Sequence, residues 1–212
     1  MDQITEPMSI EQRSFELIAE GLGDRQLDPQ YASIIKRVIH TTADFDFADN
    51  LVFSDDLLTV ARQIFQAGAR LVTDTKMAMA GINKKALAAL NCSVDCFIDN
   101  PDVVATAKSA GGTRARAAID YAVKTLEPPI VFVIGNAPTA LIRIQELVTA
   151  GDFKPAMVIG VPVGFVNVVE SKEMILSLGI PYIVARGRKG GSNVAAAICN
   201  ALLYQFTERP EL

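Results

Sequence analysis

The pattern of apolar and polar positions divides much of the chain into short apolar runs separated by amphipathic stretches. The runs are rich in β-branched residues and are flanked by Gly, Pro or Asn, which is typical of buried strands. Apolar strands that alternate with helices form parallel sheets covered on both faces. We therefore predict an α/β fold with three α/β/α layers around a mainly parallel sheet. The expected strands cover residues 70–74, 92–98, 130–134, 157–161 and 181–185.

Helical periodicity fills the stretches between these strands. The chain carries no internal repeat, low-complexity stretch or linker, and its length suits one domain. We therefore expect residues 1–212 to form a single domain. The helices expected from the pattern cover residues 54–66, 84–90, 103–110, 114–126, 138–150, 168–178 and 193–204.

A capping-box pattern near the N-terminus predicts a further helix. The pattern starts at Ser9 and ends at Gln12, and it is followed by helical periodicity through Ala19. On this helix the apolar residues expected in the core are Ile10, Phe15, Leu17 and Ile18.

The single histidine of the chain, His40, follows another expected helix, over residues 28–37, for which Asp28 is the N-cap. Unpaired carbonyls at a helix end favour a protonated imidazole, which suits a proton donor. Arg37 lies one helical turn earlier and could point to the same place. Residues 41–47 then alternate polar and apolar positions and predict an extended edge segment. A lone histidine is also compatible with a structural role, so both interpretations stay open here.

Composition and charge exclude several classes of partner. The hydrophobic content of 50% and the mean hydropathy of +0.27 indicate a large core. They also leave enough apolar residues to form a subunit interface. The net charge of −4 and the pI of about 5.1 argue against a nucleic-acid partner. No apolar run reaches the roughly 18 residues of a membrane helix, and residues 1–6 lack the apolar core of a signal peptide. We therefore expect a cytoplasmic protein with no membrane partner.

Motifs for metals and nucleotide cofactors are missing from the sequence. Cys92, Cys96 and Cys199 are odd in number, which indicates free thiols, and with one histidine they fall short of a closed zinc site. The Walker pattern and the Gly-x-Gly-x-x-Gly pattern are both absent. We therefore expect no protein-bound metal and no cofactor.

The loops after the strands are the candidate binding site, because ligands of open parallel sheets bind beyond the carboxyl ends of the strands. Each loop leads into a helix and is expected to offer backbone N–H groups to an anion. A further polar cluster, residues 111–116, adds Arg114 and Arg116, whose guanidinium groups suit carboxylates. The loop glycines are also compatible with tight turns alone. The loops cover residues 73–76, 135–139, 160–166 and 187–192.

Several of these segments together resemble the precorrin-8X methylmutase family, whose members are called cobalt-precorrin-8 methylmutase on the anaerobic route to cobalamin. Each segment alone is weakly specific. They follow one another in one order across nearly the whole chain, however, which makes a chance match improbable. The matching segments are residues 37–42 (Arg-Val-Ile-His-Thr-Thr), 74–77, 113–114, 134–141, 160–166, 170–172 and 187–192.

The resemblance implies an isomerase that moves a methyl group from C-11 to C-12 of a corrin precursor by a suprafacial 1,5-sigmatropic shift. The product would be hydrogenobyrinate or its cobalt form, cobyrinate. The resemblance also implies that His40 protonates the macrocycle and later recovers the proton, and it carries substrate contacts onto Ser14 and Arg37. It further implies an α/β/α homodimer with active sites near the subunit interface.

A tetrapyrrole with many carboxylates is thus the expected partner, so cationic side chains become candidate anchors, Arg186 and Lys189 among them. A concerted methyl migration needs no nucleophile, redox cofactor or protein metal. Met77, Phe165 and Val166 could cover the face of the macrocycle. The candidate substrate-binding residues are Ser14, Arg37, Thr75, Arg114, Arg116, Asn136 and Arg188.

Two other functions stay open at this point. A non-catalytic tetrapyrrole carrier would use the same pocket and return its ligand unchanged, with His40 as a hydrogen-bond donor only. A nucleotide- or phosphosugar-binding enzyme would use residues 187–192 as an anion loop, against which the missing motifs count. The presence of cobalt in the substrate, and hand-over of the product to the next cobalamin-pathway enzyme, also stay open.

Overall fold

A computed structural model describes residues 6–207, so the expectation about a signal peptide, made on residues 1–6, falls almost wholly outside the described part. Within that part six strands form one sheet in the order β1-β6-β5-β4-β2-β3. Strand β1 runs antiparallel to β6, and every other neighbouring pair is parallel. The strands are β1 (Leu51–Phe53), β2 (Arg70–Thr73), β3 (Ser93–Asp95), β4 (Ile130–Ile134), β5 (Met157–Gly160) and β6 (Tyr182–Ala185).

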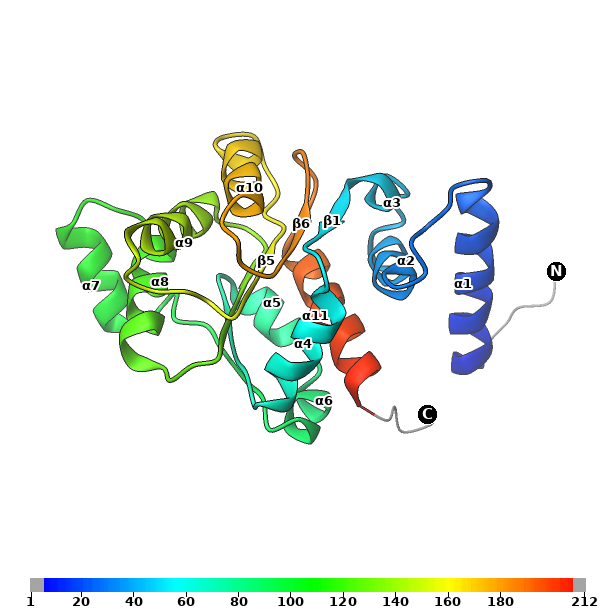
Figure 1. Cartoon of the computed structure of the whole chain (residues 1–212), viewed down its shortest axis with the longest axis horizontal. Helices are drawn as coiled ribbons and strands as arrows, with labels where there is room; N and C mark the ends of the chain where they lie inside the picture. Colours follow the sequence, from blue (N-terminus) through cyan, green and yellow to red (C-terminus); the bar gives the residue numbers. More distant parts are fainter. Residues whose placement is uncertain (1–5, 208–212) are drawn as a thin grey trace.

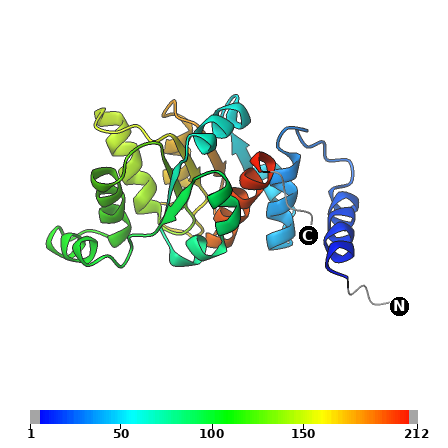
Figure 2. The same cartoon turned by 90° about the horizontal axis from the view of Figure 1, so that it is seen from below.

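Helices cover both faces of this sheet (Figures 1 and 2). Side chains of α2, α4, α5, α6 and α11 share a core with one face, and those of α8, α9 and α10 share a core with the other. Helix α7 packs outside α8, and α1 packs outside α2. The predicted three-layer α/β/α fold is therefore confirmed. The helices are α1 (Pro7–Leu22), α2 (Ala32–Thr42), α3 (Phe47–Asn50), α4 (Leu57–Gln66), α5 (Lys76–Gly81), α6 (Lys84–Ala89), α7 (Pro101–Ser109), α8 (Arg114–Thr125), α9 (Pro138–Ala150), α10 (Val168–Leu176) and α11 (Ser192–Phe206).

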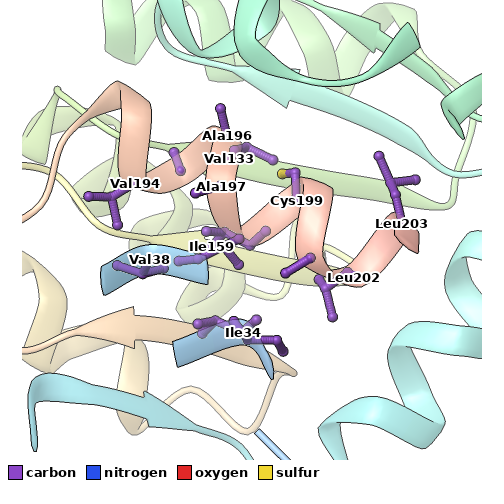
Figure 3. Close-up of a cluster of buried hydrophobic side chains, with 14 of the residues drawn as sticks. Ile34, Val38, Val133, Ile159, Val194, Ala196, Ala197, Cys199, Leu202 and Leu203 are labelled. Atoms are coloured by element: carbon purple, nitrogen blue, oxygen red, sulfur yellow. The ribbon is translucent and has the colours of Figure 1, made fainter. Parts of the chain in front are cut away.

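Helix α11 lies in the middle of the larger core. Its side chains are buried on nearly every side, as expected of an apolar helix enclosed by other elements. Figure 3 shows these side chains among Val133 and Ile159 of the sheet and Ile34 and Val38 of α2. Each fully buried Val, Leu or Ile side chain contributes about 1.5–3 kcal/mol to folding. Packing on both sides therefore holds α11 in place. Despite this apolar helix, residues 6–207 include none that is both long and apolar enough to cross a bilayer.

Residues 41–47 do not form an extended edge segment, so that prediction is wrong. Helix α2 continues to Thr42, whose hydroxyl donates to the Val38 carbonyl at 2.8 Å and accepts the N–H of Asp44 at 3.2 Å. Ala43 then adopts the left-handed conformation, with φ 54°, and ends the helix. The antiparallel edge of the sheet is instead β1, which follows the short helix α3.

Helix α1 differs from the prediction in its start, its end and its buried face. Its N-cap is Glu6, and the Ser9 hydroxyl donates to the Glu6 carboxylate at 2.7 Å instead of capping the backbone, so the capping-box prediction is wrong. The helix continues to Leu22. Ile10 is 45% exposed and Leu17 is 50% exposed, so their assignment to the core is also wrong. Helix α1 lies at one end of the molecule and packs only along one side (Figure 1), which leaves these two side chains uncovered.

Helix α2 starts later than predicted, at Ala32. The reason is that the Asp28 carboxylate accepts the N–H of Gln30 at 2.9 Å and so caps a turn that precedes the helix. Two short helices, α3 over Phe47–Asn50 and α5 over Lys76–Gly81, were not predicted, because each is too short to show a helical period.

The loop of residues 187–192 meets the loops after β4 and β5 backbone to backbone at the carboxyl edge of the sheet. A Cβ on Gly190 would lie 2.1 Å from the Val161 carbonyl oxygen, and a Cβ on Gly135 would lie 2.8 Å from the Cα of Ser192. The N–H of Gly191 donates to the same Val161 carbonyl at 2.9 Å. Glycine is needed at these positions because no side chain fits, and the chain that enters α11 can therefore lie directly on the loop after β5.

We expect Gly190→Ala to lower the free energy of unfolding by about 1–3 kcal/mol, because the backbone atoms that its Cβ would meet have to move apart. Gly112→Ala is the matched control, since a Cβ there meets no atom within 4 Å and its φ is not left-handed. Denaturant unfolding of both variants measures the difference. A Gly190→Ala protein as stable as the wild type would contradict the close contact between these loops.

Candidate functional site

His40 lies in the last turn of α2, so its predicted place at a helix end is confirmed. Its imidazole stacks on Phe15 of α1, with ring centroids 5.4 Å apart and ring planes inclined by 22°. The residue is exposed, and within residues 6–207 its ring nitrogens have no hydrogen-bond partner. One face of the imidazole thus packs on an aromatic ring, while its nitrogens stay available to a ligand.

Arg37 lies one turn before His40 and already has partners within the protein. One of its Nη atoms lies 3.1 Å from a carboxylate oxygen of Glu11. Its guanidinium carbon lies 5.3 Å from the ring centroid of Phe15 and 5.4 Å from that of Tyr204. These side chains belong to α1, α2 and α11, and Phe15, Arg37 and Tyr204 are among those that line a cavity of about 570 Å³ between the three helices.

The buried carboxylate of Asp74 organises the loop after β4. It accepts the N–H groups of Gly135, Asn136 and Ala137 at 2.9, 2.8 and 2.6 Å. Burial raises the pKa of this carboxyl, and the three N–H donors oppose the rise. The N–H groups that we expected this loop to offer to an anion are therefore taken by the protein's own carboxylate, and the expectation is wrong for this loop.

Thr75 joins the loop after β2 to the start of α11. Its Oγ1 lies 2.7 Å from the Oγ of Ser192 and accepts the N–H of Ala78 at 3.1 Å, which caps α5. The side chain of Asn136 is exposed in the neighbouring loop. The loops after β2 and β4 and the start of α11 therefore meet at one edge of the sheet.

The loop of residues 187–192 is held from two sides. From the outside, the Lys189 ammonium lies 2.6 Å from a carboxylate oxygen of Asp44 and 2.6 Å from one of Asp46. From the inside, the Lys172 ammonium donates to the carbonyls of Gly187 and Lys189 at 2.9 and 2.8 Å. Because Asp44 directly follows α2, Lys189 connects this loop to the helix that carries His40. Lys189, a candidate anchor for substrate, is therefore already paired.

Two other candidate arginines are paired as well. Arg116 donates to Glu146 at 2.7 Å, and Arg186 donates to both carboxylate oxygens of Glu173, at 2.9 and 2.7 Å. Hydrogen bonds from Arg116 and from Arg143 lower the pKa of Glu146 to about 2. A ligand carboxylate at either arginine would have to replace a carboxylate of the protein.

Arg188 and Arg114 have no carboxylate within 4 Å among residues 6–207. An exposed aromatic ring lies beside Arg188, whose guanidinium carbon is 5.8 Å from the ring centroid of Phe165. Phe165 is 85% exposed, Val166 is 77% exposed and Met77 is 70% exposed. Adjacent exposed apolar side chains, such as those of Phe165 and Val166, are a candidate binding surface. An unpaired cation beside an apolar surface suits a ligand that is flat, apolar and edged with carboxylates.

The predicted residues fall into three groups, which contacts within the protein connect. Lys189 links the loop of Arg188 to the His40 helix, and the Thr113 hydroxyl donates to the Thr139 hydroxyl at 2.8 Å, which links the start of α8 to the start of α9. Ser14 donates its hydroxyl to the Ile10 carbonyl at 2.8 Å within α1. The groups are His40, Arg37 and Ser14 on α1 and α2; Thr75, Asn136 and Arg188 at the sheet edge; and Arg114 and Arg116 on α8.

Sequence reasoning missed the role of Lys172, although a signal was present. Lys172 lies four residues after Val168 and three before Ile175, both of which are buried, so the helical period places it on the buried face of α10. It missed the role of Asp74 for a different reason. The three N–H groups that Asp74 binds lie more than 60 residues later, and no local pattern reports such a contact.

No group of three or more His, Cys, Asp or Glu side chains in the described residues is placed to hold a metal ion. Cys92, Cys96 and Cys199 are free thiols, as predicted. Burial raises the pKa of the Cys92 and Cys199 thiols.

Comparisons with known proteins give one consistent result. The family model described as precorrin-8X methylmutase matches residues 9–205. A cobalt-precorrin-8 methylmutase from Salmonella typhimurium is 46% identical over 98% of this chain and 100% of its own length. A precorrin-8X methylmutase from Pseudomonas aeruginosa is 39% identical over 95% of this chain and 97% of its own. The crystal structure of precorrin-8X methylmutase from Thermus thermophilus superimposes with a TM-score of 0.84 at 35% identity, covering 93% of this chain and 97% of that one. The chain therefore belongs to the precorrin-8X methylmutase family.

Proposed function

We propose that this protein is an isomerase of cobalamin biosynthesis that moves a methyl group from C-11 to C-12 of precorrin-8X or cobalt-precorrin-8. The product is hydrogenobyrinate or cobyrinate. The observation that carries the proposal is the exposed imidazole of His40, which has no hydrogen-bond partner in residues 6–207. It lies in a chain that matches methylmutases over nearly its whole length. The C-11–methyl bond breaks as the C-12–methyl bond forms, so the reaction consumes no second substrate.

In this proposal His40 is the acid. The protonated imidazole, held in the last turn of α2, donates a proton to the conjugated macrocycle. The protonated macrocycle is electron-poor, which favours migration of the methyl group with its bonding electrons. The imidazole then takes the proton back and is ready for the next turnover. A positioned acid of this kind contributes about 10² to 10⁴ to the rate.

Substrate carboxylates are the proposed partners of Arg188 and Arg114, which have no ion pair among the described residues. The exposed Phe165, Val166 and Met77 supply apolar surface for the face of the macrocycle. Further proposed contacts are Ser14, Arg37, Thr75, Arg116 and Asn136. Of these, Arg37 and Arg116 would exchange Glu11 and Glu146 for a carboxylate of the substrate.

We expect His40→Ala to lower turnover by about 10²- to 10⁴-fold and to leave ligand binding largely intact, because His40 supplies a proton and is not buried. Thr41→Ala, at an exposed position beside it, is the matched control and should keep wild-type activity. The measurement is anaerobic incubation with precorrin-8 followed by absorption spectroscopy, since isomerisation changes the conjugation of the macrocycle. Near-wild-type turnover by His40→Ala would remove His40 from the mechanism.

The same incubation separates the enzyme from a tetrapyrrole carrier. An enzyme converts the spectrum to that of a corrin, whereas a carrier returns its ligand unchanged. If the wild type binds precorrin-8 and its cobalt form without converting either, the carrier is correct and the isomerase proposal is wrong.

We expect Arg188→Met to weaken binding of hydrogenobyrinate by about 1.5–3 kcal/mol, the contribution of a hydrogen bond between charged groups. Arg186→Met is the matched control. It removes the same charge two residues earlier in the chain, from an arginine whose guanidinium Glu173 already neutralises. Titration of each variant with hydrogenobyrinate measures both affinities. Equal losses for the two variants would show that only net charge matters and would refute the specific contact.

We also propose that the protein is a homodimer that buries one side of α1. The support is that α1 lies at one end of the molecule (Figures 1 and 2) with Ile10 45% exposed and Leu17 50% exposed. Large exposed apolar side chains on one element are typical of an interface. Because α1 holds Phe15 against His40, such an interface would lie next to the acid.

Light scattering tests the homodimer. We expect the wild type at twice the 22.8 kDa mass of one chain, and we expect the double variant Ile10→Asp with Leu17→Asp to move toward that single mass. Gln12→Glu, which adds charge at an exposed position of the same helix, should leave the dimer unchanged. A monomeric wild type at micromolar concentration would contradict the proposal.

A further inference from the structure

One buried cation lies under the loop that carries Arg188. Lys172 of α10 is 0% exposed, and its ammonium donates to the carbonyls of Gly187 and Lys189, the residues on either side of Arg188. Within residues 6–207 no carboxylate lies within 4 Å of this ammonium. A buried charge without a counter-ion opposes folding, so its presence calls for a compensating role.

We propose that Lys172 is a positioning residue for substrate binding: it fixes the two carbonyls that flank Arg188, and its charge is balanced by the substrate carboxylate that Arg188 binds. This inference rests on the function proposed above and extends it to a residue that does not itself touch the substrate. It explains why a lysine, and not an apolar residue, lies on the buried face of α10 between Val168 and Ile175.

The backbone on both sides of Arg188 is held in place. The carbonyl of Arg188 accepts the N–H of Gly164 at 3.1 Å, and the carbonyls of Gly187 and Lys189 accept the two hydrogen bonds from Lys172. Three successive carbonyls therefore have donors within the protein. With its backbone fixed in this way, the exposed Arg188 side chain loses less freedom when it binds a carboxylate.

The surroundings of Lys172 leave its charge uncompensated. The elements that pack on α10 are α9, β5, β6 and the loop of residues 187–192, and β5 brings no titratable side chain. Burial alone lowers the pKa of Lys172 to about 8, since no neighbouring charge shifts it. The titratable or charged side chains on these elements, on α10 itself and at Arg186 beside the loop are Arg143, Glu146, Glu170, Glu173, Tyr182, Arg186, Arg188 and Lys189.

The buried charge of Lys172 therefore predicts how the affinity for a carboxylate ligand changes with pH. Without ligand, Lys172 loses its proton as the pH rises through about 8. A carboxylate bound nearby favours the charged ammonium and raises this pKa, so binding takes up a proton above pH 8. Below pH 7 the lysine is charged with and without ligand, and it takes up none. The affinity for a polyanionic ligand must accordingly fall as the pH rises above about 8.

Calorimetric titration with hydrogenobyrinate tests the proposal, at pH 7.0 and pH 8.5 and in two buffers of different ionisation heat. We expect the wild type to take up a fraction of a proton at pH 8.5. Lys172→Met should lose this uptake and bind about tenfold more weakly at pH 7.0, where Lys172 is charged. Lys85→Met is the control of equal charge, at an exposed position on α6, and should match the wild type.

A double-mutant cycle adds a test of the link to Arg188. If Lys172 acts through Arg188, then Lys172→Met costs less affinity in an Arg188→Met background than in the wild type. If Lys172→Met does not fold, Arg188→Met alone decides, since it must reduce the proton uptake at pH 8.5. Full uptake in that variant would overturn the proposal.

The outcomes separate this inference from the proposed function. Wild-type binding without proton uptake, or uptake that persists in Lys172→Met, overturns the role of Lys172 and leaves the methylmutase proposal standing. A wild type that binds neither hydrogenobyrinate nor its cobalt form overturns both.

Discussion

The enclosure of α11 between the sheet and α2 is the constraint on which the candidate site depends. This helix is buried on nearly every side, and it follows β6, so the chain enters it at the carboxyl edge of the sheet. At that edge the entering chain crosses the Val161 carbonyl, where space remains for Gly190 alone. Ser192 then meets Thr75, and Arg188 comes to the surface beside Phe165. Packing of the core thus sets the place of a charged group that is itself exposed.

Most charged side chains near this edge are paired within the protein, so the unpaired ones are the candidates for binding a ligand. Asp74 takes three backbone N–H groups, and Lys189 holds Asp44 and Asp46. Such contacts build a rigid frame before any ligand arrives, which lowers the entropy lost on binding. Against that frame Arg188, with no ion pair among residues 6–207, is set apart from its neighbour Arg186, although the two look alike in the sequence.

The fold was predictable from the sequence because it depends on local period and on apolar runs. Strand β4 is apolar at every position, and its boundaries were predicted without error. Residues 41–47 were mispredicted because their alternation comes from a helix end and a turn, in which Thr42 and Asp44 bond to nearby backbone. The pairing of charges was not predictable, since Lys189 and Asp46 lie 143 residues apart. A cationic side chain can be recognised as a candidate anchor from the sequence, but whether it is free to bind is decided by contacts between distant segments.

The parts of the candidate site that contain Arg188 and His40 are held by elements of very different burial. Arg188 is positioned by α11 and by the buried Lys172 of α10, and both helices pack directly on the sheet. His40 and Arg37, by contrast, both contact Phe15 of α1, the helix that packs on one side only and leaves Ile10 and Leu17 exposed. An element with few buried contacts is among the first to open locally. His40, the proposed acid, therefore has the less secure support of the two, and a partner subunit that covered α1, as proposed, would also determine how firmly its imidazole is held.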